Sequence, residues 1–275
     1  MSNARVVNDM PAEEYHRVPA VSSTFIKKFS VSPAESQIQM ESSPSMVIGS
    51  GAHSLILEGA DVFGKEFTIS PKFDLRTNIG KSDKAKFELA NIGKTPLNED
   101  QFNLVQGMNA SVFAHPTSSL LFNGGTPEVS VFWTDDTTGM DCKARFDYLT
   151  KGMIVDLKTA ADASAGGFER AIAKYSYHIQ AAFYLRAAKE AGLDVGTFTF
   201  VAVGNSEPHE VTVGEIDVDA VSRSHLECNR ILSLIKECRE RNYWPAFQIP
   251  KHITSLDEIT ASSLFVQFSV PKWAV

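Results

Sequence analysis

The chain has 275 residues, of which 43% are hydrophobic and 10% aromatic. This length allows one large or two small domains, and this composition excludes a disordered chain. Apolar runs fall short of the roughly 18 residues of a membrane span, and the N-terminal segment lacks the apolar stretch of a secretory signal. We therefore expect a cytoplasmic protein with no membrane contact.

Cysteine content and net charge exclude further classes of protein. Cys142, Cys228 and Cys238 are too few for a disulfide framework and lack the paired spacing of a zinc site. The net charge of -7 excludes nucleic-acid binding through bulk positive charge. A local basic groove remains compatible with it, because a hydrolase that holds divalent metals gathers carboxylates in its site.

The first part of the chain is predicted to be helical. Serine and threonine at positions 22–24 would cap a helix over 25–29. Residues 45–57 form a helix that is apolar on most sides, so we expect it to be buried. From 74 to 93 the chain turns polar and basic, which indicates an exposed loop and helix.

The second part changes to a strand pattern. Three β-rich runs at 129–134, 141–149 and 153–158 are separated by turn residues and predict an antiparallel meander. The remaining expected elements are a helix at 168–191, strands at 197–203 and 210–216, and a helix at 217–243. A weakly patterned tail at 248–275 ends in apolar residues and could pack against the body of the protein or against a neighbouring subunit. We expect one α/β domain, with a central mixed sheet flanked by helices and an N-terminal helical lobe.

Asp147, Asp156 and Lys158 carry the strongest chemical signal. The two aspartates can face each other across neighbouring strands, and Lys158 shares the face of Asp156 because strand side chains alternate. They could form an ordinary charged pair beside a turn aspartate, but charges inside an apolar strand are costly unless paired or bound to metal. Two carboxylates suit Mg²⁺, and the lysine would orient the attacking water or offset charge on a phosphate.

Gln180 and Tyr184 lie four residues apart on the following predicted helix. Both side chains therefore emerge on one face of that helix. Tyr184 alone would be read as a core residue. Together with the polar Gln180 on the same stripe, it is expected near the edge of the carboxylate cluster.

Five segments, in this order, resemble the PD-(D/E)XK nucleases: GAHSLILEG, EVSVFW, KARFDYL, VDLKT and HIQAAFY. More narrowly, over residues 12–247 they resemble the RecE type, exodeoxyribonuclease VIII, of phage and prophage recombination systems. The sequence departs from the family pattern at Phe146, where the family name calls for proline. That position shapes the strand and is not expected to bind metal.

The resemblance implies roles for individual residues. It implies that His53, Asp147 and Asp156 bind the metal. Lys158 becomes the catalytic lysine and Glu128 an acid that reaches the metal or its water, while Gln180 and Tyr184 hold the DNA backbone near the scissile phosphate.

The resemblance also implies a site for the 5′ phosphate of a DNA end. In related ring-shaped exonucleases a basic residue and a hydroxyl near the N-terminal helices hold this group, and Arg145 is a further candidate because arginine suits bidentate phosphate contact. The basic segment at 76–86 is a candidate for a DNA channel. The residues proposed on these grounds are Arg17, Ser22, Ser23, Thr24, Arg76, Lys81 and Arg145.

The activity that the resemblance implies is Mg²⁺-dependent degradation of one strand of duplex DNA from its end, 5′ to 3′, with Mn²⁺ able to substitute. The product would be a single strand for an annealing protein of the RecT kind, and the enzyme would form a ring of identical subunits. One alternative is a RecB-like or Cas4-like nuclease of other polarity, although three scattered cysteines do not supply a Cas4-like iron–sulfur cluster. Another is a non-catalytic DNA-binding subunit.

Overall fold

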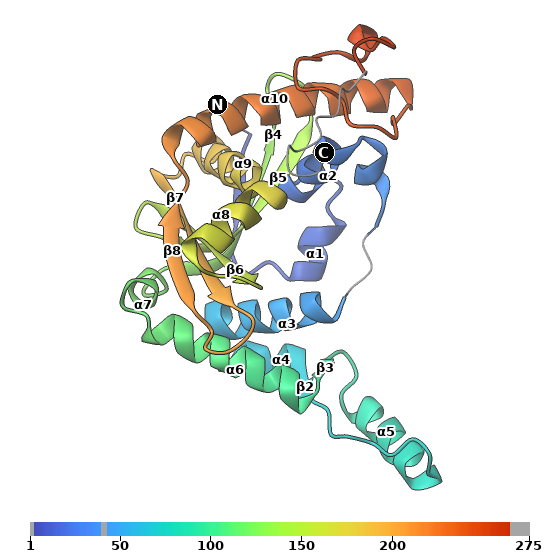
Figure 1. The fold of residues 1–275 in the computed structure, drawn as a ribbon, viewed down its shortest axis with the longest axis vertical. Helices are drawn as coiled ribbons and strands as arrows, with labels where there is room; N and C mark the ends of the chain where they lie inside the picture. Colours follow the sequence, from blue (N-terminus) through green and yellow to red (C-terminus); the bar gives the residue numbers. More distant parts are fainter. Residues whose placement is uncertain (1–2, 40–42, 265–275) are drawn as a thin grey trace, which may run out of the picture.

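The computed structural model describes residues 3–39 and 43–264. Its centre is a six-stranded sheet with the strand order β1-β4-β5-β6-β7-β8 (Figure 1). Neighbouring strands are antiparallel except for the parallel pair β6 and β7, so the sheet is mixed, as predicted. The strands are β1 (Arg5–Val7), β4 (Thr126–Thr134), β5 (Asp141–Thr150), β6 (Met153–Ala160), β7 (Thr197–Gly204) and β8 (Val211–Glu215).

One face of the sheet carries the larger core. It is covered by the helices α2 (Ser23–Val31), α8 (Ala165–Lys174), α9 (Tyr177–Glu190) and α10 (Val218–Arg241). Phe146, Phe183 and Phe200 are the largest fully buried side chains there. The C-terminal residues as far as 264 pack beside α10, whereas the apolar tail residues Phe265, Phe268, Val270 and Trp273 lie outside the described residues.

The opposite face is covered by the helix predicted at 45–57, which is buried over its second half only, since Met46 in its first turn is 42% exposed. It consists of α3 (Pro44–His53), which continues as a π-helical turn over Ser54–Glu58. A second helix, α6 (Glu99–Ala114), packs beside it and completes a smaller core. None of the helices within the described ranges has the length and apolar character to cross a membrane.

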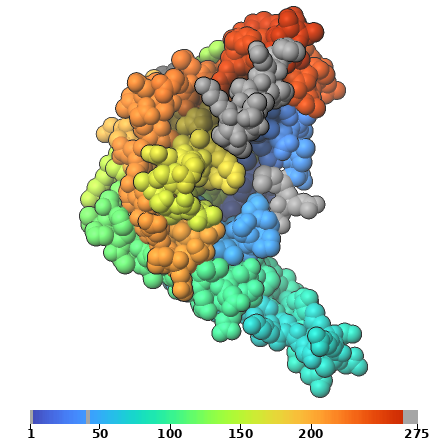
Figure 2. All heavy atoms as spheres, in the orientation of Figure 1, coloured from blue at the N-terminus to red at the C-terminus, as the bar shows by residue number. Residues whose placement is uncertain are grey.

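An arm projects from this side of the molecule (Figures 1 and 2). It carries α5 (Asn78–Ala90), the helix of the basic segment. Its base is a small parallel sheet of two strands that the sequence did not predict. The remaining elements around it are α4 (Ala60–Glu66), β2 (Phe67–Ile69), β3 (Thr95–Leu97) and α7 (Pro116–Leu121).

The N-terminal lobe is fixed to the sheet by a buried lysine. The Nζ atom of Lys143 on β5 donates hydrogen bonds to the carbonyls of Tyr15, His16 and Val18, at 2.8, 3.2 and 2.8 Å. These carbonyls lie at the end of α1 (Ala12–Arg17), where helix carbonyls lack partners within the helix. These hydrogen bonds therefore hold α1 beside the candidate active site.

The prediction of a single helix at 168–191 is wrong. The chain breaks at Ser176, whose φ of 53° lies in the left-handed region, and α8 and α9 flank this break. The sequence shows no proline or glycine between 168 and 191, so the helical pattern looked continuous. The break lets the ring of Tyr177 pack against Phe168 and Phe200, a tertiary contact that local propensity does not encode.

Replacing the core ring of Phe146 by alanine should lower the free energy of unfolding by about 3–5 kcal/mol, because a fully buried ring leaves a cavity. Phe113→Ala is the matched control, since Phe113 is 45% exposed on α6 and should change stability by no more than about 0.5 kcal/mol. Urea unfolding followed by circular dichroism measures both. Equal losses in the two variants would contradict the assigned core.

Candidate active site

Three acidic residues lie at one level of three neighbouring strands. The register between β4 and β5 places Glu128 opposite Asp147, and the register between β5 and β6 places Asp147 opposite Asp156. Regular pairing is interrupted at this level: the first ladder skips the Glu128 position, and the second ends at the pair Tyr148 and Val155. The sheet therefore opens where the carboxylates gather.

The interruption changes which side chains point to each face. Phe146 packs into the larger core, whereas Tyr148, two residues later, packs into the smaller one. Glu128 has a φ of 53°, in the left-handed region, and the Asp147 carboxylate accepts a hydrogen bond from the backbone N–H of Leu157 at 2.8 Å. Such distortions are common beside active sites, because they aim a side chain away from its regular position.

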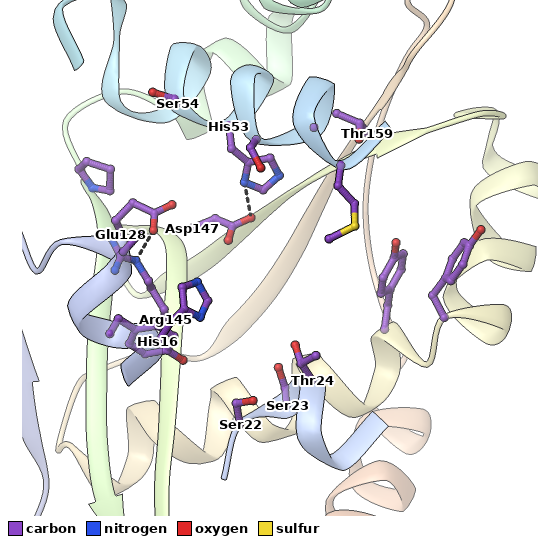
Figure 3. Close-up of a pocket in the computed structure, with 18 of the residues that line it drawn as sticks. His16, Ser22, Ser23, Thr24, His53, Ser54, Glu128, Arg145, Asp147 and Thr159 are labelled. Atoms are coloured by element: carbon purple, nitrogen blue, oxygen red, sulfur yellow. Dashed lines mark hydrogen bonds and ion pairs between the residues drawn. The ribbon is translucent and has the colours of Figure 1, made fainter. Parts of the chain in front are cut away.

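His53 completes a group with two of the carboxylates. It is the last residue of α3, and its Nδ1 lies 3.7 Å from Oδ2 of Asp147 (Figure 3). One ligand atom from each of His53, Glu128 and Asp147 lies within 4.8 Å of the other two. An imidazole and two carboxylates at this separation suit a divalent metal ion. The donor set therefore fits the metal that the sequence predicts.

Asp156 was predicted to bind the metal together with Asp147, but in the structure its carboxylate contacts Lys158 and Gln180. Its carboxylate forms an ion pair with Lys158 and accepts a hydrogen bond from Nε2 of Gln180 at 2.7 Å. The Oε1 atom of Gln180 in turn accepts a hydrogen bond from Nζ of Lys27 at 3.2 Å. Asp156 is therefore held by Lys158 of its own strand and by Gln180 of α9, and the group of potential ligand atoms around His53 does not include it.

Burial is the largest cause of the pKa shifts of Glu128, Asp156 and His53. It raises the pKa of Glu128 to about 7 and that of Asp156 to about 6, and each is raised further by the neighbouring Asp147. Burial and the charge of Lys158 lower the pKa of His53 to about 4, so its imidazole is neutral at physiological pH. A neutral imidazole is the form that binds metal.

Lys158 stays charged in this environment. Burial opposes its charge, but Asp156 and Asp147 outweigh burial and raise the pKa of the ammonium. Lys27 behaves in the opposite way, because burial and the nearby Lys158 lower its pKa to about 8. The site thus holds one firmly charged lysine and one that is easily deprotonated.

Arg145 lies beside the metal-binding group. Its Nε forms an ion pair with Glu128, and its guanidinium carbon lies 5.5 Å from the ring centroid of Tyr15. Its Nη1 is buried and has no hydrogen-bond acceptor among the described residues. A buried donor without a partner is costly, so this atom is suited to an anionic ligand.

A cleft of about 1600 Å³ borders the metal-binding group and Arg145, whereas Asp156, Lys158 and Gln180 lie outside its lining. His53, Glu128, Arg145 and Asp147 line it on one side, and the segment at 22–24 lines it on another (Figure 3). The hydroxyl of Ser22 accepts a hydrogen bond from the Phe25 N–H and so caps α2, while Ser23 is buried beneath the cleft surface and Thr24 is exposed. Tyr184 also lines the cleft, with its ring 5.4 Å from that of Phe146.

Three of the predicted DNA-binding residues lie elsewhere. Arg17 is exposed, forms an ion pair with Glu13 and does not line the cleft. Arg76 and Lys81 lie on the arm, outside the cleft lining. The structure therefore separates them from the carboxylates, whereas it places Arg145 directly beside Glu128.

The sequence analysis missed Lys27 and Tyr177. Lys27 lies four residues after Ser23 on α2, so both occupy one face of a helix that leads into the site. Tyr177 lies three residues before Gln180 and therefore shares its helix face. Helical spacing from the predicted residues was the available signal, but it does not reveal which face meets the sheet.

A mixed sheet flanked by helices, with acidic residues and a lysine on two neighbouring strands, defines the PD-(D/E)XK nuclease fold. A family model described as a PDDEXK-like domain of unknown function (DUF3799) matches residues 22–248, and the chain belongs to that family. The structure is similar to a crystal structure from Eubacterium rectale, provisionally described as an exonuclease, with a TM-score of 0.57. The two share 16% identity over 84% of this chain and 87% of that one, which shows a shared fold. No curated protein matches the sequence significantly.

Removing a ligand of the metal-binding group should weaken Mn²⁺ binding. We expect His53→Ala and Asp147→Ala each to lower the affinity by at least about tenfold, since even residues that only support metal ligands contribute that much. His252→Ala is the control, because His252 is exposed and does not line the cleft. Isothermal titration calorimetry with Mn²⁺ measures the three affinities. Unchanged binding in both site variants would exclude this metal site.

Proposed function

We propose that the protein is a Mg²⁺-dependent exodeoxyribonuclease of the RecE type, in which Mn²⁺ can replace Mg²⁺. The observation that carries the proposal is the convergence of His53, Glu128 and Asp147 beside the paired Asp156 and Lys158. This arrangement joins a hard-ligand site, whose residues line an open cleft, to a buried ammonium beside it. Membership of the PDDEXK-like family supports a phosphodiester hydrolase.

His53, Glu128 and Asp147 would hold the ion, and Asp156 lies near this group, since the charge of Asp147 raises the pKa of Asp156. A bound Mg²⁺ would supply Lewis-acid activation of water and of a phosphate oxygen. The neutral imidazole and the buried carboxylates leave their lone pairs available for such an ion.

Lys158 is placed to act on the reacting groups. Its ammonium stays charged, so it can orient an attacking water by hydrogen bonding and offset charge that develops on the phosphate oxygens. Asp156 and Gln180 fix its position, because Gln180 holds one oxygen of Asp156 and Lys158 pairs with the other. Gln180 is in turn oriented by Lys27.

We infer the mode of action from the open cleft and from the basic group beside the carboxylates. We propose that a DNA end enters the cleft and that Arg145 holds the 5′ phosphate through its unpartnered Nη1. Digestion would then run 5′ to 3′ and leave a single strand for a RecT-like annealing protein in phage-type recombination. A ring of identical subunits would keep the enzyme on its DNA, and the arm around α5 is a candidate subunit or DNA contact.

A non-catalytic DNA-binding subunit is the second candidate function. Such a protein would not need to keep a charged lysine paired with a buried carboxylate, since burying these charges costs free energy. A RecB-like nuclease of other polarity would share the same site chemistry. Labelling either end of a duplex and following release of the label distinguishes the two polarities.

Asp156→Asn and Lys158→Met should abolish Mg²⁺-dependent digestion of linear duplex DNA, with rates lowered by at least about a hundredfold. Asp156→Asn removes the charge that fixes Lys158, and Lys158→Met removes the ammonium but keeps its volume. Gel assays of linear plasmid measure the rates, and circular dichroism checks that the variants are folded. The exposed Lys151→Met is the control and should digest at the wild-type rate. Wild-type rates in the two site variants would exclude this strand as catalytic.

End specificity provides a separate expectation. Linear duplex should be degraded while covalently closed circular duplex is spared, and ends with a 5′ phosphate should be preferred over ends with a 5′ hydroxyl. Arg145→Ala should reduce the phosphate preference, and Arg17→Ala should leave it unchanged because Arg17 lies outside the cleft lining. Rapid cutting of the closed circle would indicate an endonuclease on the same fold.

A further inference from the structure

The corner between α8 and α9 forms a wall of the cleft in which aromatic rings alternate with ammonium groups. Lys174, Tyr175 and Tyr177 line the cleft, and Lys27 and Lys158 lie behind Tyr177. We call these five residues the tyrosine ladder. None of its aromatic residues belongs to the metal-binding group or to the pairs around Asp156, so the proposed chemistry does not account for them.

The residues of the tyrosine ladder form a row that leads from Lys158 to the protein surface. Nζ of Lys158 lies 5.1 Å and Nζ of Lys27 5.4 Å from the ring centroid of Tyr177. The rings of Tyr177 and Tyr175 are 5.6 Å apart with an angle of 32° between their planes. Nζ of Lys174 lies 5.1 Å from the Tyr175 ring. A continuous path of rings and cations thus begins at the proposed catalytic lysine.

Exposure increases along this path. Lys158 is largely buried and Tyr177 is half-buried, whereas Tyr175 is 51% exposed and contributes little to the core. The left-handed backbone of Ser176 lies between the two tyrosines and ends the regular helix there. A continuous helix would place residues 175 and 177 about 200° apart around its axis, on opposite sides. The break instead brings both rings to the same wall.

We propose that the tyrosine ladder binds unpaired nucleotides of the strand whose phosphate lies at Lys158. Aromatic side chains stack on exposed base faces of any sequence, and interleaved cations contact the backbone that joins those bases. Bases inside a duplex are already stacked on their neighbours, so only a strand separated from its partner can use the ladder. The proposal rests on the proposed nuclease function and specifies its substrate as a frayed or single-stranded end.

Binding of a single-stranded oligonucleotide in the absence of divalent metal tests the proposal without any cleavage. Fluorescence anisotropy with a labelled 12-nucleotide strand should show that Tyr175→Ala weakens binding by about tenfold. Tyr175→Phe keeps the stacking surface and should bind within about twofold of wild type. Tyr243→Ala is the matched control, because Tyr243 is 54% exposed at the end of α10 and does not line the cleft.

A fully paired hairpin with a closed, capped end is the second ligand. Its affinity should change by no more than about twofold in Tyr175→Ala, since it offers no unpaired base. Unchanged binding of the single strand by Tyr175→Ala would overturn the proposal. Equal weakening for the single strand and the capped hairpin would also overturn it, because the ladder would then contact duplex rather than unpaired bases.

Cleavage kinetics separate this proposal from the nuclease function. With Mg²⁺, Tyr175→Ala should raise KM for a duplex with a frayed end by about tenfold and leave kcat unchanged, because the ring contacts substrate away from the reacting phosphate. A protein that binds the single strand through Tyr175 but never cleaves would contradict the nuclease function and leave the ladder supported. A protein that cleaves with an unaltered KM in Tyr175→Ala would contradict the ladder alone.

Discussion

Burial of three carboxylates at one level of the sheet is the constraint that shapes this molecule. Isolated charges in such a place would cost several kcal/mol each, so each must be paired, protonated or bound to a cation. Glu128 pairs with Arg145, and Asp156 pairs with Lys158. Asp147 accepts a hydrogen bond from the backbone N–H of Leu157 and lies beside His53 of α3. A divalent ion would offset the remaining repulsion among these groups.

Elements on both faces of the sheet supply these partners. From one face, α3 brings the imidazole of His53, and from the other, α2 and α9 bring Lys27 and Gln180. The buried Lys143 holds the N-terminal lobe over the same edge by binding three carbonyls. The two cores therefore do more than stabilise the sheet, because they set the positions of groups that are far apart in the chain.

Much of the site could be predicted from short-range patterns. The period of two along β6 placed Asp156 and Lys158 on one face, and their ion pair confirms this. Spacing of four on α9 placed Gln180 and Tyr184 on one helix face, and the hydrogen bond from Gln180 to Asp156 shows that this face meets the carboxylates. The sequence did not predict that Glu128 would stand with Asp147 while Asp156 turned to other partners, because this depends on a local break in strand pairing.

Alternation and helical periodicity are local properties, so the mixed α/β architecture, the helix before the arm and the polar residues inside apolar strands could be predicted from the sequence. The tertiary fold sets the end of α8, because the left-handed Ser176 is stabilised by the packing of Tyr177 against Phe168 and Phe200. It also decided which basic residues reach the cleft. Arg145 lies there and Lys81 does not, because proximity across the fold depends on the path of the whole chain rather than on the residues nearby in sequence.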